Sequence, residues 1–597
     1  MKRATYVLGI NSAYHESAAC LLKNGRIIAA AEEERFNRVR HAKPARVNNP
    51  NELPWSAIRY CFKRAGVKIE DISHIGYSLD PKERLARNSA YQHPYEVTPN
   101  DFGTKNGEQL FYERILEVEK ILRQAGFRGE FHFLNHHDCH AASAFFVSPF
   151  QDAGILVVDG IGEFESTTIY TGRGNRIERT FEINYPNSLG FLWEKISKFL
   201  GFSEYDSAKV MGLAAYGDPS IFRAKFESLL HLDERVEGNF EVNDSICRFR
   251  SEDFSALENL FGVKKRNDPI KTVDNETKDY ADIAAALQEA TEKIILALAL
   301  KIRKEGYSNL CLAGGVALNC VANGRLIQES LFKEIFIQPA ANDAGTAIGA
   351  VYYIWNQLLG NSRSYIFDSP YLGPQFSNEE IREALDKHGL IYTKPENIEH
   401  VAAKLIAEGK IVAWFQGRME LGPRALGNRS ILADPRNPNI ASELNSKVKY
   451  REPFRPLCPS VLEEEAAHWF DLGSKLMSPA KYMISTYKVQ PSKRDLIPAV
   501  VHVDGTGRIQ SVSKEGNPKY HALISEFHRL TGVPIVLNTS FNVREPIICT
   551  PQEAVRTFLS TRIDYLAIGD FLVSKADNEV VCPVPDIPLK EYFERLR

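Results

Sequence analysis

Short apolar runs rich in β-branched residues alternate with longer amphipathic stretches through the first half of the chain. The runs TYVLGI, RIIAAAEE, HIGYSL, GILVVD, NLCLAGG and EIFIQP have the length and composition of strands. Residues 107–125 and 279–305 are amphipathic and predict helices. Strands that alternate with helices predict an α/β architecture.

A change of pattern near residue 361 divides the chain. Residues 361–375, NSRSYIFDSPYLGPQ, are rich in turn formers and have no periodicity, which predicts a linker. A second region follows with its own strand candidates, IVAWF and PIVLNTS. We therefore expect one domain over residues 1–360 and another over 376–597.

Composition excludes several classes of protein. The 597 residues are 44% hydrophobic and 25% charged, with a net charge of −3, so nothing global favours a nucleic-acid partner. No apolar run approaches about 18 residues, and the N-terminal run Tyr6–Ile10 is too short for a signal peptide. The nine cysteines are odd in number and lack CxxC spacing, so we expect reduced thiols and a cytoplasmic protein.

Two histidines and two aspartates form a candidate metal site. His136 and His140 are spaced i, i+4, which on a helix places both imidazoles on one face. Asp159 ends the strand GILVVD, and Asp343 follows the strand EIFIQP, where ligands of α/β sheets bind. This mixed N/O set suits iron, zinc or manganese. The alternatives are surface or capping histidines and, for Asp343, a helix N-cap.

Glycine-rich segments follow three of the predicted strands: LGINSAYHES, VVDGIGE and LAGGVALNC, the last with Gly314, Gly315 and Asn319. Glycine lets the backbone approach a phosphate or adenosine closely. His15 follows the first strand and could take a proton from an alcohol, or simply bond to its own loop. Lys209 is a candidate anion contact or an exposed lysine at a helix start.

Residues 418–455 are locally basic in a chain that is acidic overall. Interleaved glycines and prolines argue for fixed loops, which can clamp phosphates bidentately through arginine; an interface or a surface charge run is the alternative. Downstream, HVDGTGRIQ and LNTSFN offer polar groups for a triphosphate and an amide. The basic residues are Arg418, Arg424, Arg429, Arg436, Lys447, Lys449, Arg451 and Arg455, and the downstream groups are His502, Arg508, Gln510, Asn538, Ser540 and Asn542.

The segments together resemble the O-carbamoyltransferase family of nodulation-factor, cephamycin, aminoglycoside and ansamycin carbamoyltransferases. The resemblance is collinear from residue 6 to about residue 550. It rests on LGINSAYHESAA, EEERFNR, NHHDCHAASAF, VVDGIGE, KVMGLAAYG, GGVALNC, NDAGTAIGA, GRMELGPRALGNRSILADPR, REPFRPLCPSVL, HVDGTGRIQ and LNTSFN.

This resemblance implies an N-terminal actin-like ATPase-fold domain, similar to the tRNA-threonylcarbamoylation protein. It also implies a C-terminal domain similar to threonylcarbamoyl-adenylate synthase. In the family, carbamoyl phosphate and ATP (with Mg²⁺) give carbamoyl-adenylate, and the N-terminal domain transfers the carbamoyl group with an iron-type metal. The matching positions are His136, His140, Asp159 and Asp343 as ligands and His15 as the base.

Some positions depart from the family pattern. His15-Glu16-Ser17 stands where HDA or HDS is common, and Ala208-Lys209 replaces glycine-lysine. The loop NRVRHAKPARVNN is unusually basic, which leaves the acceptor alcohol open; a guanidinium alkaloid of the saxitoxin type is one candidate. We expect a small-molecule alcohol, no nucleic acid or membrane partner, and a homodimer as a candidate assembly.

Two other functions compete with this hypothesis. A tRNA-threonylcarbamoylating fusion would need an RNA-binding surface, which the net charge does not favour. A non-catalytic actin-fold ATPase would not explain the arginine cluster or HVDGTGRIQ.

Overall fold

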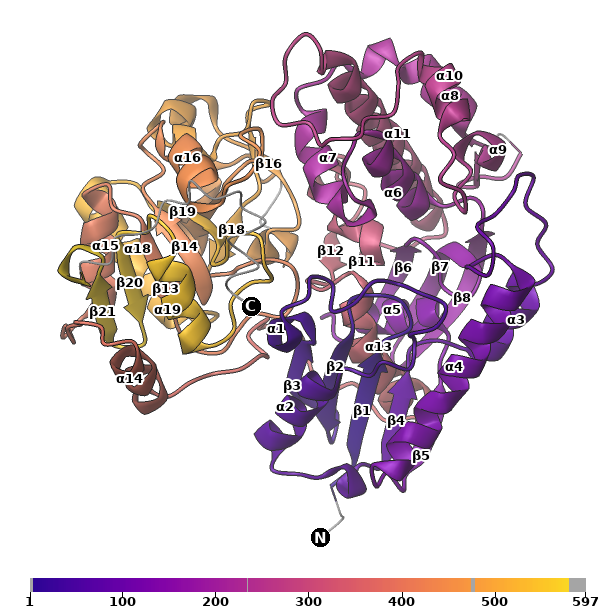
Figure 1. Ribbon diagram of the computed structural model, residues 1–597, viewed down its shortest axis with the longest axis horizontal. Helices are drawn as coiled ribbons and strands as arrows, with labels where there is room; N and C mark the ends of the chain where they lie inside the picture. Colours follow the sequence, from indigo (N-terminus) through magenta and orange to yellow (C-terminus); the bar gives the residue numbers. More distant parts are fainter. Residues whose placement is uncertain (1–3, 234, 474–477, 579–597) are drawn as a thin grey trace.

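The computed structural model describes residues 4–233, 235–473 and 478–578 of the chain. Two regions lie side by side, an N-terminal one of two sheets with their helices and a C-terminal one built on a single sheet (Figure 1). The stretch 361–376 between them contains no helix or strand. The chain is therefore a mixed α/β protein, as predicted.

The first sheet has the strand order β3-β2-β1-β4-β5. The strands β1, β2 and β3 pair antiparallel, and β4 and β5 then add in parallel on the other side of β1. The bounds are Tyr6–Asn11, Ala18–Lys23, Arg26–Glu32, His74–Tyr77 and Glu130–Phe133. The sequence predicts β1, β3 and β4 but not β2 or β5.

The second sheet repeats this topology, with the order β12-β11-β6-β7-β8. Here β6, β7 and β8 pair antiparallel, and β11 and β12 add in parallel beside β6. The bounds are Asp152–Val158 (β6), Glu165–Arg173 (β7), Arg176–Asn184 (β8), Asn309–Ala313 (β11) and Glu334–Ile337 (β12). Two copies of one βββαβαβ unit are the plan of the actin-like ATPase fold, which confirms the fold predicted for the N-terminal domain.

Two small-residue helices join the sheets. Helix α13 (Thr346–Tyr352) packs on α5 (His136–Phe145) and on β1. A Cβ at Gly349 would lie 1.7 Å from the carbonyl oxygen of Cys139 in α5. The run AGTAIGA is therefore needed because backbones touch here, and this close crossing fixes α5 beside the loop that precedes α13.

The C-terminal region has a seven-stranded sheet of order β18-β15-β19-β14-β13-β20-β21. Its pairs are mixed, with β13 parallel to β20 and antiparallel to β14. The strands are β13 Val412–Phe415, β14 Arg429–Ala433, β15 Cys458–Leu462, β18 Gln510–Val512, β19 Ile535–Ser540, β20 Tyr565–Ile568 and β21 Phe571–Ser574. The predicted strands IVAWF and PIVLNTS correspond to β13 and β19.

The other helices and short strands surround these sheets. The predicted helices 107–125 and 279–305 correspond to α4 and α11. In the N-terminal region lie α1 Glu34–Asn37, α2 Trp55–Ala65, α3 Pro81–Asn88, α4 Lys105–Gln124, α6 Leu189–Phe199, α7 Ser207–Ala214, α8 Arg223–Leu229, α9 Asp244–Cys247, α10 Ser255–Phe261, α11 Lys278–Lys304, α12 Cys320–Gln328 and the pair β9 Leu230–Leu232 and β10 Phe240–Val242. In the C-terminal region lie α14 Asn378–Lys387, α15 Ile398–Ala407, α16 Ile440–Glu443, α17 Ala466–Trp469, α18 Pro518–Thr531, α19 Pro551–Leu559 and the pair β16 Tyr487–Lys488 and β17 Thr506–Gly507. None of the helices in the described ranges combines the length and the apolarity needed to cross a bilayer.

Candidate functional site

Helix α5 carries the two predicted histidines on one buried face. The side chain of Asn135 caps the helix by accepting from the N–H of Asp138, so the helix begins at His136. Both imidazoles are fully buried. The alternative of surface histidines is therefore wrong.

The hydrogen bonding of His136 fixes its tautomer. Nδ1 lies 2.9 Å from the carbonyl oxygen of Ser78, which can only accept, so Nδ1 carries the proton. The lone pair of the neutral ring is then on Nε2. This Nε2 and both ring nitrogens of His140 are buried and form no hydrogen bond in the structure.

Asp159 is held at the end of β6 with one oxygen committed. The N–H of Gly315 donates to Oδ1 at 2.8 Å, which leaves Oδ2 facing the histidines. Gly314 permits this approach, because its φ is +91° and a Cβ there would lie 2.2 Å from the carbonyl oxygen of Val158. The glycines of LAGGVALNC thus orient a carboxylate.

Asp343 comes from the loop after β12 and begins a short 3₁₀ helix, Asp343–Gly345. No side-chain cap is made there, so the N-cap alternative is not supported. Its Oδ1 lies 3.6 Å from Nε2 of His136 and 3.8 Å from Nε2 of His140. The two carboxylates therefore approach the same two imidazoles from different segments of the chain.

The four side chains fit a divalent metal ion. Oδ2 of Asp159 lies 3.5 Å and 3.6 Å from the two Nε2 atoms, too far for good hydrogen bonds. Ligands at about 2.1 Å from a tetrahedral ion are roughly 3.4 Å apart, close to these separations. Burial raises the pKa of Asp159, but the two histidines lower it by a larger amount. The pKa of Asp159 therefore lies well below its usual value. Burial lowers the pKa of His136, but Asp343 and Asp159 raise it by more, to well above its usual value. The two buried carboxylates therefore call for positive charge beside them, which a bound metal ion would supply.

A cavity of about 660 Å³ opens beside this cluster and reaches the C-terminal region. Asp159, Asp343, Gly315 and Asn319 line its N-terminal side, together with His15. On the opposite side the lining side chains are Arg424, Arg451, Arg455, Arg508, Asn538 and Ser540. Residues more than 100 positions apart in sequence thus share one enclosed space.

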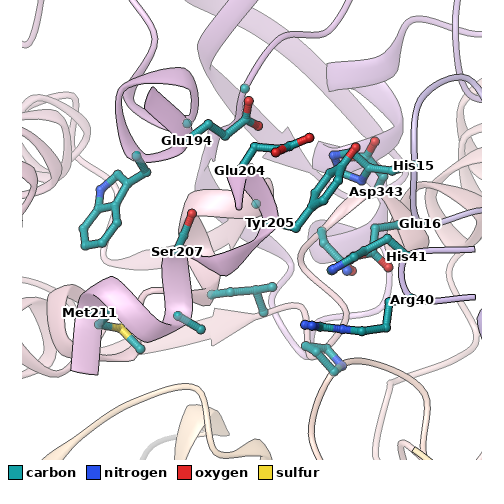
Figure 2. Close-up of a pocket in the computed structure, with 18 of the residues that line it drawn as sticks. His15, Glu16, Arg40, His41, Glu194, Glu204, Tyr205, Ser207, Met211 and Asp343 are labelled. Carbon is teal, nitrogen blue, oxygen red and sulfur yellow. The ribbon is translucent and has the colours of Figure 1, made fainter. Parts of the chain in front are cut away.

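His15 lies next to Asp343 at the rim of the metal cluster (Figure 2). Its Nδ1 is buried and forms no hydrogen bond in the structure, so the ring is not tied to its own loop. The Tyr205 ring packs edge-on against the imidazole with centroids 5.4 Å apart. The neighbouring Glu16 has a φ of +52° and pairs with His41. The imidazole is therefore held between protein groups with a free nitrogen.

The arginines on the opposite wall are crowded, and among the described residues only Arg455 pairs with an acid, Glu452. Burial, followed by the positive charge of Arg508, lowers the pKa of Arg424 to about 9. Burial and Arg455 lower the pKa of Arg451 to about 9 as well. Nε of Arg424 and one terminal nitrogen of Arg451 are buried and form no hydrogen bond in the structure. An anion such as a phosphate would relieve this repulsion.

The rest of the basic cluster is used by the protein itself. Arg418 donates to the carbonyls of Ile28, Leu372 and Gly373 and does not line the cavity. Lys449 is buried and donates to Ser540 and Asn542, so it shapes the LNTSFN loop rather than the cavity wall. The other members follow the same rule: Arg429 donates to the carbonyls of Gln416 and Pro374, Arg436 pairs with Asp434, and Lys447 pairs with Glu443.

Other predicted binding residues lie just behind the cavity wall. Gln510 donates to the carbonyl of Leu426 and accepts from Asn538. Lys209, at the start of α7, pairs with Asp206 at 3.1 Å and with Glu452 at 3.6 Å. His502 packs against the Tyr216 ring, and its buried Nε2 has no hydrogen bond in the structure. None of Gln510, Lys209 and His502 is among the described lining residues.

The EEERFNR segment of the N-terminal region forms hydrogen bonds with the loop that carries Arg424. Glu32 accepts from the N–H of Gly422, and Arg35 donates to the carbonyl of the same residue, both at 2.8 Å. A Cβ at Gly422 would lie 2.9 Å from the carbonyl oxygen of Pro339, on the loop that leads to Asp343. Gly422 therefore joins the segment that carries Arg424 to the loop that carries a metal-site aspartate. The sequence alone assigns no such role to this motif.

Family models match both regions. The model described as Carbamoyltransferase N-terminus matches residues 6–352, and the one described as Carbamoyltransferase C-terminus matches residues 403–575. The chain belongs to the carbamoyltransferase family. It is an enzyme, and the resemblance read from the sequence is confirmed.

Three relatives are similar to the chain over most of their length. Nodulation protein NolNO of Sinorhizobium fredii is 38% identical over 95% of this chain and 80% of its own. An uncharacterised protein of Synechocystis, sll1178, is 39% identical over 96% and 97%. Nodulation protein U of Rhizobium tropici is 31% identical over 89% of each chain.

Two solved structures are distantly similar to the chain. Component A of the (R)-2-hydroxyglutaryl-CoA dehydratase of Acidaminococcus fermentans is 16% identical, with a TM-score of 0.31 over 58% of this chain and 97% of its own. HypF of T. kodakarensis is 17% identical, with a TM-score of 0.30 over 60% and 48%.

Several cavity residues of this carbamoyltransferase were missed in the sequence. Glu194 and Glu204 line the space near His15 together with Tyr205 (Figure 2). Burial is the largest cause that raises the pKa of Glu194, to about 8. These residues lie on α6 and just before α7, far from any motif, so only the tertiary structure identifies them.

Proposed function

We propose that this carbamoyltransferase forms carbamoyl-adenylate from carbamoyl phosphate and ATP, and then transfers the carbamoyl group to the hydroxyl of a small molecule. The single observation that carries the proposal is the shared cavity, which has unpaired buried guanidinium nitrogens on one wall and the His/Asp cluster with His15 on the other. Anionic substrates suit the first wall, and a reacting carbonyl suits the second.

The first half-reaction belongs to the arginine side. Water releases phosphate from carbamoyl phosphate, leaving a carbamate. A carbamate oxygen then attacks the α-phosphorus of ATP, and pyrophosphate leaves. Arg424, Arg451 and Arg508 would hold the phosphates, since arginine forms paired charge-assisted hydrogen bonds with them. The repulsion among these buried arginines would fall as the anions bind.

The second half-reaction belongs to the histidine side. The hydroxyl oxygen of the acceptor attacks the carbamoyl carbon, His15 takes the hydroxyl proton, and AMP leaves. A divalent ion such as iron, zinc or manganese, held by His136, His140, Asp159 and Asp343, would polarise the carbamoyl carbonyl. A 660 Å³ space admits a small molecule rather than a folded polymer.

The proposal is tested on the full-length protein with ATP, Mg²⁺ and carbamoyl phosphate. We expect exchange of labelled pyrophosphate into ATP that depends on carbamoyl phosphate, and a mass gain of one carbamoyl group on some member of an alcohol panel. Exchange that instead requires threonine with bicarbonate would favour the tRNA-modification alternative. ATP hydrolysis that ignores carbamoyl phosphate would contradict the proposal.

A further inference from the structure

Three side chains with metal-binding atoms gather on the first sheet, apart from the cavity. His74 begins β4, while Glu130 and His132 lie on the edge strand β5. In the parallel pairing His74 stands opposite Glu130, and Gly76 stands opposite His132. Since side chains two positions apart share a face of a strand, the register places all three on one face.

The donor atoms converge on one point. Nδ1 of His74 lies 3.3 Å from Nε2 of His132, and Oε2 of Glu130 lies 3.7 Å and 4.0 Å from these two atoms. Donors at about 2.1 Å from a tetrahedral ion are roughly 3.4 Å apart. The imidazole pair already has this spacing. The glutamate oxygen lies slightly too far from both nitrogens, and its side chain, which is 75% exposed, is free to rotate toward them.

The two ligand nitrogens form a hydrogen bond with each other, and a metal ion would replace the hydrogen between them. Within the described residues, no group outside this trio hydrogen-bonds to either imidazole. A second cavity of about 510 Å³ is lined by His132, with Asp80 and Lys82 at the start of α3, but not by His74 or Glu130. Water reaches the trio from the side of Glu130, whose side chain is exposed, and could fill a fourth coordination position as in zinc sites with three protein ligands.

We propose that His74, Glu130 and His132 form a second divalent-metal site of the zinc class, which ties the edge strand β5 to β4. A set of two imidazoles and one carboxylate suits zinc better than it suits magnesium or calcium. The 52 residues between β4 and β5 include α3 and α4, so a bound ion would close this crossover at the edge of the sheet (Figure 1). The site is separate from the cluster on α5 and does not depend on the proposed reaction.

The test titrates Zn²⁺ into the full-length protein after chelator treatment and counts bound ions by elemental analysis. We expect two ions in the wild type and one in His74→Asn and His132→Asn. Glu130→Gln should keep the second ion with a Kd at least about tenfold higher. His231→Asn is the matched control, because His231 also lies near a glutamate, Glu241, at 3.4 Å but has no second histidine; it should keep both ions.

Co²⁺ provides an independent readout. The wild type should show one more tetrahedral cobalt absorption than His132→Asn, which requires no change at the α5 cluster. Equal zinc stoichiometry and equal Kd in wild type and His132→Asn would overturn the proposal. A loss of the second ion in His231→Asn as well would also overturn it, because the binding would then be that of ordinary surface histidines.

Discussion

The two walls of the cavity differ in the charge of the ligand that each would bind. On the α5 side, two buried carboxylates face the Nε2 atoms of two buried imidazoles, and a cation would complete the set. On the other side, buried guanidinium groups crowd one another and an anion would complete them. Each wall is thus built for a ligand that the other would repel. The contrast supports the proposal that a single space holds both a phosphate-bearing intermediate and a metal-assisted transfer.

If the walls divide the reaction, His15 should affect only transfer. His15→Asn removes the group that takes the acceptor proton, so transfer should fall by about 10²–10⁴-fold. Pyrophosphate exchange should stay close to the wild-type rate, because His15 lies on the metal side. Equal loss of both activities in a folded variant would break the division of labour.

The arginine wall is tested by Arg424→Ala. Leaving phosphate charge unpaired in a buried site costs about 2–5 kcal/mol, so exchange should fall by roughly 30- to 5,000-fold. Arg436→Ala is the control, since Arg436 is paired with Asp434 away from the cavity. Unchanged exchange in Arg424→Ala would count against the placement of the phosphates.

The metal wall is tested by His136→Ala. With one of four ligands removed, affinity for Fe²⁺ or Zn²⁺ should fall by at least about 100-fold, more than the usual effect of a residue behind a ligand. Elemental analysis after gel filtration measures the retained metal, and transfer should be lost in parallel. Full metal content in this variant would refute the assignment of His136.

The smallest effect is expected at the hydrogen bonds that join Glu32 and Arg35 to Gly422. Arg35→Lys keeps the positive charge beside Glu32 but loses the planar guanidinium group that reaches Gly422. The loops that carry Arg424 and Asp343 should then shift relative to each other. We expect pyrophosphate release within about twofold of wild type, and about five- to tenfold less carbamoyl product per pyrophosphate. Arg363→Lys, which alters an arginine bound to carbonyls outside the cavity lining, should leave this ratio unchanged.

The sequence determined the local parts of this protein. The i, i+4 spacing of His136 and His140, the carboxylates at strand ends and most strands of the parallel pairs could be read directly, because each depends on a few adjacent residues. The missed strand β2 (AACLLK) lacks a clear alternation, whereas β8 (RIERTFEIN) alternates more and less exposed positions and could have been predicted from the sequence. Both faces of β2 are buried, so its pattern is not that of a half-exposed strand.

Only the tertiary structure decided which polar groups face the cavity. Arg418, Lys449 and Arg424 look alike in sequence, yet the first two use their hydrogens on the protein's own carbonyls and the third keeps a buried nitrogen free. The difference arises from which backbone segments pass nearby. Asp159 and Asp343 likewise meet because two crossovers and the Gly349–Cys139 contact bring their loops together. Such contacts depend on packing across hundreds of residues, which no local pattern encodes.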